Sequence, residues 1–127
     1  MATGNFLLDK GYDAGGAITK FRAVKFSAEE TVVQVTAVGD NVIGIEQFGV
    51  TVAETGRGKG ASVRRMGASE MEASAAIAPG DLVGITADGR AVANPGAGTR
   101  VIGVCDEGAA AAGERIRVTL NLPGRLA

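Results

Sequence analysis

Short runs of Val, Ile and Thr alternate with polar residues along most of the chain, and Gly, Pro, Asp and Asn separate these runs. The clearest run is RIRVTLNL (115–122), in which Arg, Arg, Thr and Asn alternate with Ile, Val, Leu and Leu. A period of two places one set of side chains in water and the other in a core, which is typical of a half-buried antiparallel strand. Turn sequences recurring about every eight to twelve residues predict an all-β domain.

The same pattern predicts further strands at residues 21–27, 31–38, 42–48, 50–54, 61–66, 81–86, 90–94 and 101–106. Asp88-Gly89, between GIT and RAVA, is the strongest hairpin signal, because both residues tolerate the φ values of tight reversals. The segment ASEMEASAAI (68–77) is ambiguous, since its Ala and Glu content favours a helix. We expect a strand or irregular chain there, because the segment aligned with it contains the paired glycines Gly15 and Gly16.

Two similar phrases, NVIGIEQFG (41–49) and RVIGVCDEG (100–108), lie 59 positions apart. The match extends without a gap from Ala17/Ala76 to Gly44/Gly103, with nine identities in 28 positions. Roughly one position in ten would agree by accident, so the pattern predicts an internal duplication. The copies rejoin at Gly60/Gly113, so we expect about six extra residues in the first copy, centred on ETGRGKGAS (54–62).

Two turns of the second copy change in the first. Glu29-Glu30 replaces Asp88-Gly89 and lacks a residue that readily adopts positive φ, so a wider turn is expected. Lys20-Phe21-Arg22 replaces Pro79-Gly80-Asp81, which leaves the geometry of that turn open.

The length of 127 residues suits one domain, in which two small copies share a core. We therefore predict a compact antiparallel β-barrel or sandwich built from two similar halves, with an extended N-terminal arm. The expected boundaries are residues 1–16 for the arm and 17–127 for the domain, with pseudo-repeats at about 17–67 and 76–120.

Charge and composition exclude several classes of function. A net charge of −1 and a pI near 5.4 argue against nucleic-acid and membrane-surface partners. The first residues lack a basic start followed by an apolar block, so we expect a protein made and kept in solution, by default in a cytoplasm.

Catalytic and ligand sites are not expected. The chain has no histidine, which removes Ser-His-Asp and Cys-His catalysis within one subunit. Cys105, within VIGVC, is interpreted as a small buried residue; an enzyme acting through it would instead be sensitive to thiol reagents. The glycines of ETGRGKGAS lack the spacing of a phosphate loop, and the acidic pairs do not resemble a calcium loop. We predict a protein without enzymatic activity, metal or cofactor.

Apolar ends and one basic stretch are the candidate contact sites. The stretch NFLLDKGY (5–12) carries apolar surface that must pack on something, either its own barrel or a neighbouring subunit or partner. The same choice applies to the C-terminal leucines. The basic stretch of Arg57, Lys59, Arg64 and Arg65 could dock on carboxylates of a partner. The predicted partner-contact residues are Asn5, Phe6, Leu7, Leu8, Tyr12, Arg57, Lys59, Leu122 and Leu126.

Residues 76–120 resemble the small capsid decoration, or cement, proteins of tailed bacteriophages. The resemblance lies in the turn Pro79-Gly80-Asp81-Leu82-Val83, the strand Val101-Ile102-Gly103-Val104 and the ending Gly113-Glu114-Arg115-Ile116-Arg117-Val118. It implies a protein on the outer capsid surface of the virion, synthesised in the host cytoplasm. Such a protein usually binds as a homotrimer and clamps the major capsid protein, and family precedent makes the region Asn5 to Leu8 a capsid contact.

The alternative is a glycan-binding surface or adhesion module of the virion, which exposed aromatic residues at loop tips would favour. The chain has few aromatic residues, and Phe26 aligns with Ile85, which favours a core position.

Overall fold

A computed structural model describes residues 6–126, with side chains described for residues 8–122. Within this range nine strands form one continuous sheet, and the all-β prediction is confirmed. The elements are β1 (Phe6–Ala14), β2 (Ala23–Ala28), β3 (Thr31–Gln34), β4 (Gly44–Glu46), α1 (Val52–Thr55), β5 (Ala61–Glu72), β6 (Leu82–Ile85), β7 (Ala91–Ala93), β8 (Arg100–Glu107) and β9 (Arg115–Leu126).

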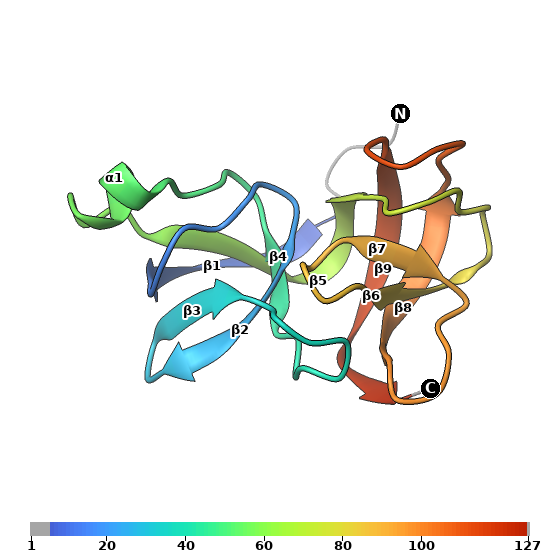
Figure 1. Ribbon diagram of the computed structural model, residues 1–127, viewed down its shortest axis with the longest axis horizontal. Helices are drawn as coiled ribbons and strands as arrows, with labels where there is room; N and C mark the ends of the chain where they lie inside the picture. The colour runs from blue at the N-terminus through green and yellow to red at the C-terminus, as the bar shows by residue number, and fades with distance from the viewer. Residues whose placement is uncertain (1–5, 127) are drawn as a thin grey trace.

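The first unit is a closed five-stranded barrel. Its strands follow the order β1-β3-β2-β4-β5, and β1 pairs with β5 to complete the circle. The pair β1–β3 is parallel, with Asp13 opposite Thr31, whereas the other pairs are antiparallel. This barrel and α1 occupy the left half of the molecule in Figure 1.

The second unit continues the same sheet from the far end of β5. Residues 67–72 pair with β9, which is followed by β8, β6 and β7. A parallel bridge from Ala73 to Ala91 brings β7 back beside the end of β5. The strand β5 therefore belongs to both units, which lie side by side along the long axis of the molecule (Figure 1).

Strand pairings recur in both units at the offset of the repeated phrase. The pairs Val24/Gly44, Ala14/Val32 and Ile18/Val50 of the first unit correspond, 59 positions later, to Val83/Gly103, Ala73/Ala91 and Ile77/Ala109. The final strand has a different offset, because Tyr12/Ala61 corresponds to Met71/Ile116, and 116 − 61 = 55. The first copy thus carries four extra residues (59 − 55) instead of about six.

The strand β1 takes part in this correspondence. Its pairing with the start of β5 matches the pairing of the second half of β5 with β9. Residues 6–14, within the segment that sequence analysis assigns to an arm, therefore form the first strand of the first unit.

The repeated VIG sequence has a steric cause. A Cβ atom on Gly44 would overlap the carbonyl oxygen of Arg64 on β5, and one on Gly103 would overlap that of Thr119 on β9. Only glycine lets the two backbones approach so closely at these equivalent positions.

Two apolar clusters form the core. The first fills the barrel with Tyr12, Ile18, Val24, Val32, Ile43, Val50, Ala61 and Val63. The second fills the other unit but also includes Ala23, Val35, Val42 and Ile45 of the first unit. Both units therefore contribute to the core at their junction. There, Arg22 also forms an ion pair with Glu72 at 3.2 Å and donates to the Asp88 carbonyl oxygen at 3.2 Å.

The strand predicted at 50–54 is wrong, because Val52–Thr55 form α1. A capping box starts the helix: Thr51 Oγ1 accepts from the Glu54 amide at 3.2 Å, and a Glu54 carboxyl oxygen accepts from the Thr51 amide at 2.9 Å. The T-x-x-E spacing could have revealed this start, but the Val-Thr-Val run is also typical of a strand. The ambiguous segment 68–77 is strand as far as Glu72.

The two altered turns keep tight geometry. Glu29-Glu30 forms a two-residue turn between the paired Ala28 and Thr31, with Glu30 at φ 53°, so the expected wider turn is wrong. Phe21 adopts φ 61° where Gly80 adopts φ 90°. Both residues donate their amide to the equivalent carbonyl, Glu46 or Cys105, at 2.8 Å. Strand pairing on both sides imposes these turns against local preference.

Replacing Glu30 by glycine is expected to raise the free energy of unfolding by about 1 kcal/mol, because a non-glycine residue pays about that much for positive φ. The ion pair of Glu30 with Lys10, 3.5 Å long and exposed, contributes little. Urea denaturation measures the change. The matched control is Glu29→Gly, which should destabilise, because φ is not positive there; equal or lower stability for Glu30→Gly would contradict the prediction.

Candidate functional site

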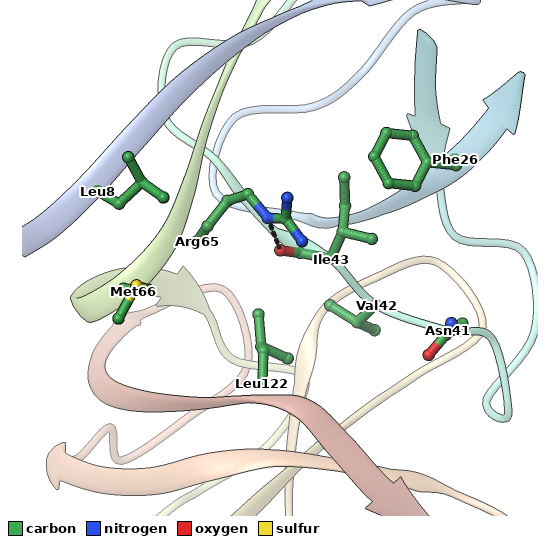
Figure 2. Close-up of a pocket in the computed structure, with 8 residues that line it drawn as sticks. All are labelled: Leu8, Phe26, Asn41, Val42, Ile43, Arg65, Met66 and Leu122. Carbon is green, nitrogen blue, oxygen red and sulfur yellow. Dashed lines mark hydrogen bonds between the residues drawn. The ribbon is translucent and has the colours of Figure 1, made fainter. Parts of the chain in front are cut away.

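An apolar groove lies where the two units meet (Figure 2). Its volume is about 450 Å³, and it is lined by Leu8, Phe26, Asn41, Val42, Ile43, Arg65, Met66 and Leu122. Four strands supply its rim: β1 provides Leu8, β2 provides Phe26, β5 provides Met66 and β9 provides Leu122. Val42 and Ile43, which precede β4, are buried beneath them.

The rim residues expose large apolar side chains. Leu8 is 41% exposed, Phe26 45% and Met66 50%. Leu8 and Met66 are direct partners across β1 and β5, so they form a continuous apolar edge. An exposed apolar cluster of this kind, beside a hollow, is typical of a protein interaction site.

Arg65 adds a positive charge to the groove. Its Nε donates to the Ile43 carbonyl oxygen at 3.2 Å, as Figure 2 shows, and Nη1 donates to the Tyr12 hydroxyl at 2.9 Å. Both acceptors are neutral, and no carboxyl group forms an ion pair with Arg65 among the described side chains. The groove is therefore suited to an apolar partner surface that carries an acidic group.

A second exposed surface lies at the end of the molecule that carries α1. We call it the α1 tip and define it by Phe48, Val52, Arg57 and Lys59. Phe48 is 68% exposed and Val52 75% exposed, and both basic residues are exposed. The Glu54 carboxyl group accepts hydrogen bonds from the Thr51 amide and from Lys59 Nζ, the latter at 3.0 Å. These bonds, the first more than the second, lower the pKa of Glu54 to about 2.

The buried Glu46 shapes the α1 tip. One of its carboxyl oxygens accepts from the amides of Phe48 and Gly49, and the other accepts from the Ser62 amide at 2.9 Å. These bonds hold the turn that carries Phe48. The duplication could have identified Phe48 as a functional residue, because the aligned residue is Glu107. The fold accepts a charged residue at that position, so it does not require the aromatic ring.

The structure treats the predicted contact residues differently. Leu8 and Leu122 meet at the groove, whereas Arg57 and Lys59 lie at the α1 tip. Tyr12 belongs to the first core cluster, where its ring packs edge-on against Phe26 at 5.4 Å. Asn5 lies outside the described residues, as do the side chains of Phe6, Leu7 and Leu126.

The sequence gives no signal for Met66, and the alignment of Phe26 with Ile85 predicts a core position that the structure does not show. Ile85, the counterpart of Phe26, is fully buried, but Phe26 faces the groove.

The described residues 6–126 show no group of three Cys, Asp or Glu side chains placed to hold a metal ion. Cys105 is buried, and burial raises the pKa of its thiol. Among the helices of the described chain, none is long and apolar enough to cross a membrane.

No curated protein sequence matches the chain significantly. The fold is similar to the crystal structure of the N base of head fiber gp8.5 of bacteriophage phi29, with a TM-score of 0.68 and 18% identity. The alignment covers 94% of this chain and 98% of that one. A model of the phage cement proteins matches residues 34–120, so the chain belongs to the phage cement protein family, a family of structural proteins associated with the phage capsid.

Proposed function

We propose that this protein binds the outer surface of a phage head and stabilises the shell of major capsid protein. The family match over residues 34–120 is the observation that carries the proposal. The groove at the junction of the two units supports it, because its exposed apolar rim can bind another protein without any catalytic reaction.

The proposed mechanism is mass action. A protein that binds the assembled shell, but not separated capsid subunits, stabilises the shell by an amount set by its affinity and occupancy. The apolar rim of the groove would supply most of the affinity, and Arg65 would select a surface with an acidic group. Self-association, as a homotrimer in our proposal, would multiply weak contacts by raising the effective concentration at neighbouring sites.

Undecorated heads provide the test. The purified protein should co-sediment with them and raise the temperature at which they release DNA. Met66→Glu places a charge on the apolar rim and should weaken binding at least tenfold, equivalent to about 1.4 kcal/mol. Ala112→Glu is the matched control, because it adds the same charge at an exposed residue of the turn before β9, and the strand from Arg115 to Leu122 alone spans about 23 Å.

A wild-type protein that fails to co-sediment with heads would overturn the proposal. The glycan-binding alternative is favoured by one observation, the exposed ring of Phe48, which lines a surface hollow together with Thr51 and Lys59. It predicts binding to bacterial or virion polysaccharide, loss of that binding in Phe48→Ser, and no stabilisation of heads.

A further inference from the structure

We infer that two copies of this protein associate head to tail, with the α1 tip of one copy docked on an exposed row of the second unit of the next. The outer row, as we call it, consists of Leu82, Val104 and Thr119, flanked by Asp81 and Asp106. This inference deepens the self-association proposed above and rests on that part of the proposed function, but it does not depend on binding to heads.

The outer row crosses three strands. Leu82 on β6 pairs with Val104 on β8, and Val104 pairs with Thr119 on β9. Leu82 is 39% exposed and Val104 41% exposed. Two large apolar side chains thus stand together on the outside of the sheet, with the exposed Thr119 beside them.

The first unit contains residues equivalent to the outer row, and their surroundings indicate what this row can bind. The equivalent pair in the first unit is Ala23 and Ile45, which are fully buried because the second unit packs on them. In one unit the row is therefore a protein interface, and in the other it faces solvent. We conclude that the outer row is also suited to a protein partner.

The partner does not bind by repeating the junction between the two units. In such a repeat, the first unit of a second copy would pack on the outer row as the second unit packs on Ala23 and Ile45. The junction depends on Arg22, which pairs with Glu72 and Asp88. At the equivalent positions, Asp81 would face Asp13 and Glu29 of a second copy. Like charges oppose this arrangement, so the occupant must present cationic groups.

Acidic residues surround the outer row. Asp81 precedes Leu82, and Asp106 lies two residues after Val104 on the same exposed side. Asp106 accepts from the Thr119 hydroxyl, and neither aspartate has a cationic partner among the described side chains. Glu107, 72% exposed at the side chain, adds negative charge but lies 3.9 Å from Arg117.

The α1 tip has the complementary character. Phe48 and Val52 provide exposed apolar groups, while Arg57 and Lys59 provide positive charge. Lys59 is partly neutralised by Glu54, whereas Arg57 has no acidic partner among the described side chains. Arg57 is therefore the charge most available for Asp106 or Asp81.

The two surfaces lie on different units. Figure 1 shows α1 at one end of the long axis and the strands β6 and β8 in the opposite half. Contacts between two different patches are heterologous, and they produce a closed ring or an open chain.

Charge reversal tests the inference. In sedimentation velocity over a range of concentrations, the wild-type protein should self-associate. Arg57→Glu and Asp106→Lys should each weaken association at least tenfold, because each variant brings like charges together. An equimolar mixture of the two variants should regain association, since every tip then finds an oppositely charged row. Both sites are exposed, so unchanged thermal unfolding verifies that the variants fold.

Glu29→Lys is the matched control and should leave self-association unchanged; a strengthened association would indicate the repeated junction and overturn the inference. A monomeric wild-type protein, or variants that associate as the wild type does, would also overturn it. If the wild type is monomeric and Asp106→Lys loses binding to heads, the outer row contacts the capsid instead of a second copy. Self-association that follows the charge pattern without head binding would overturn only the proposed capsid function.

Discussion

Replacing Gly103 by alanine is expected to lower the free energy of unfolding by about 3 kcal/mol. The new Cβ atom would overlap the carbonyl oxygen and carbon of Thr119 and press on the side chain of Val118. Most of these atoms belong to the backbone of β9, which is paired with β8 and cannot rotate away as a side chain could. Relief of the overlap requires separation of β8 from β9, and this separation would open the core of the second unit.

Urea denaturation measures this loss, and Gly96→Ala is the matched control. A Cβ atom at Gly96 meets no atom within 4 Å, and φ is not in the positive range there. The control should therefore retain the stability of the wild type. Gly44→Ala, which makes the corresponding overlap with Arg64, should be destabilised as Gly103→Ala is. A Gly103→Ala protein as stable as the Gly96→Ala control would refute the steric account of the VIG repeat.

Most of the fold could be predicted from local sequence patterns and from the repeated phrase. Alternation in residues 115–122 predicted β9, and Asp88-Gly89 predicted a hairpin that the structure forms with Gly89 at φ 84°. The steric role of Gly44 and Gly103 could not be derived, because it depends on which residue of the next strand lies opposite. Such register becomes known only when the strands are paired.

Closure of the sheet also determines the candidate sites. The groove collects side chains from β1, β2, β5 and β9, and no local pattern relates Leu8 to Met66 or Leu122. Leu8 and Leu122 could be predicted as contact residues from their apolar character near the ends of the chain. No sequence signal marks Met66, because methionine is among the residue types that are most often buried. Alignment with the apolar Ile85 predicts a core position for Phe26, but only Ile85 is buried in a core cluster, whereas Phe26 is 45% exposed at the groove.

Differences between the two copies locate the interaction surfaces better than either copy alone. Equivalent positions have similar backbone conformations. A difference in residue type or exposure between them therefore reflects what lies outside each unit. Ala23 and Ile45 are covered by the second unit, whereas their counterparts Leu82 and Val104 are exposed. Phe48 is exposed where the second copy has Glu107. The duplication therefore supplies an internal reference that separates residues required by the fold from residues available for partners.

Glu46 is the strongest case of this divergence, because its counterpart is Cys105. Both residues are buried, and both accept an equivalent backbone hydrogen bond at 2.8 Å, Glu46 from Phe21 and Cys105 from Gly80. The carboxyl group of Glu46 also accepts from the amides of Phe48, Gly49 and Ser62. The first copy has thus acquired a buried acceptor that organises the turn before α1.

Glu46→Ala is expected to lower the free energy of unfolding by about 3 kcal/mol, because it leaves three amides without an acceptor, at about 1 kcal/mol or more each. Glu46→Gln should lose about half as much: the amide oxygen can still accept from Phe48 and Gly49, but the amide nitrogen would face the Ser62 donor. Cys105→Ala, at the matched position, should lose only the contacts of one sulfur atom.

Hydrogen exchange separates the local role of Glu46 from a general loss of stability. In Glu46→Ala, the amides of Phe48 and Gly49 should exchange much faster than those of the strands around Val118, whereas in Cys105→Ala they should keep their protection. Self-association should weaken together with this protection, because a loosened turn no longer holds Phe48 in place at the α1 tip. Protected amides at Phe48 and Gly49 in the Glu46→Ala protein would show that the turn holds without the carboxyl group and would contradict the role assigned to Glu46.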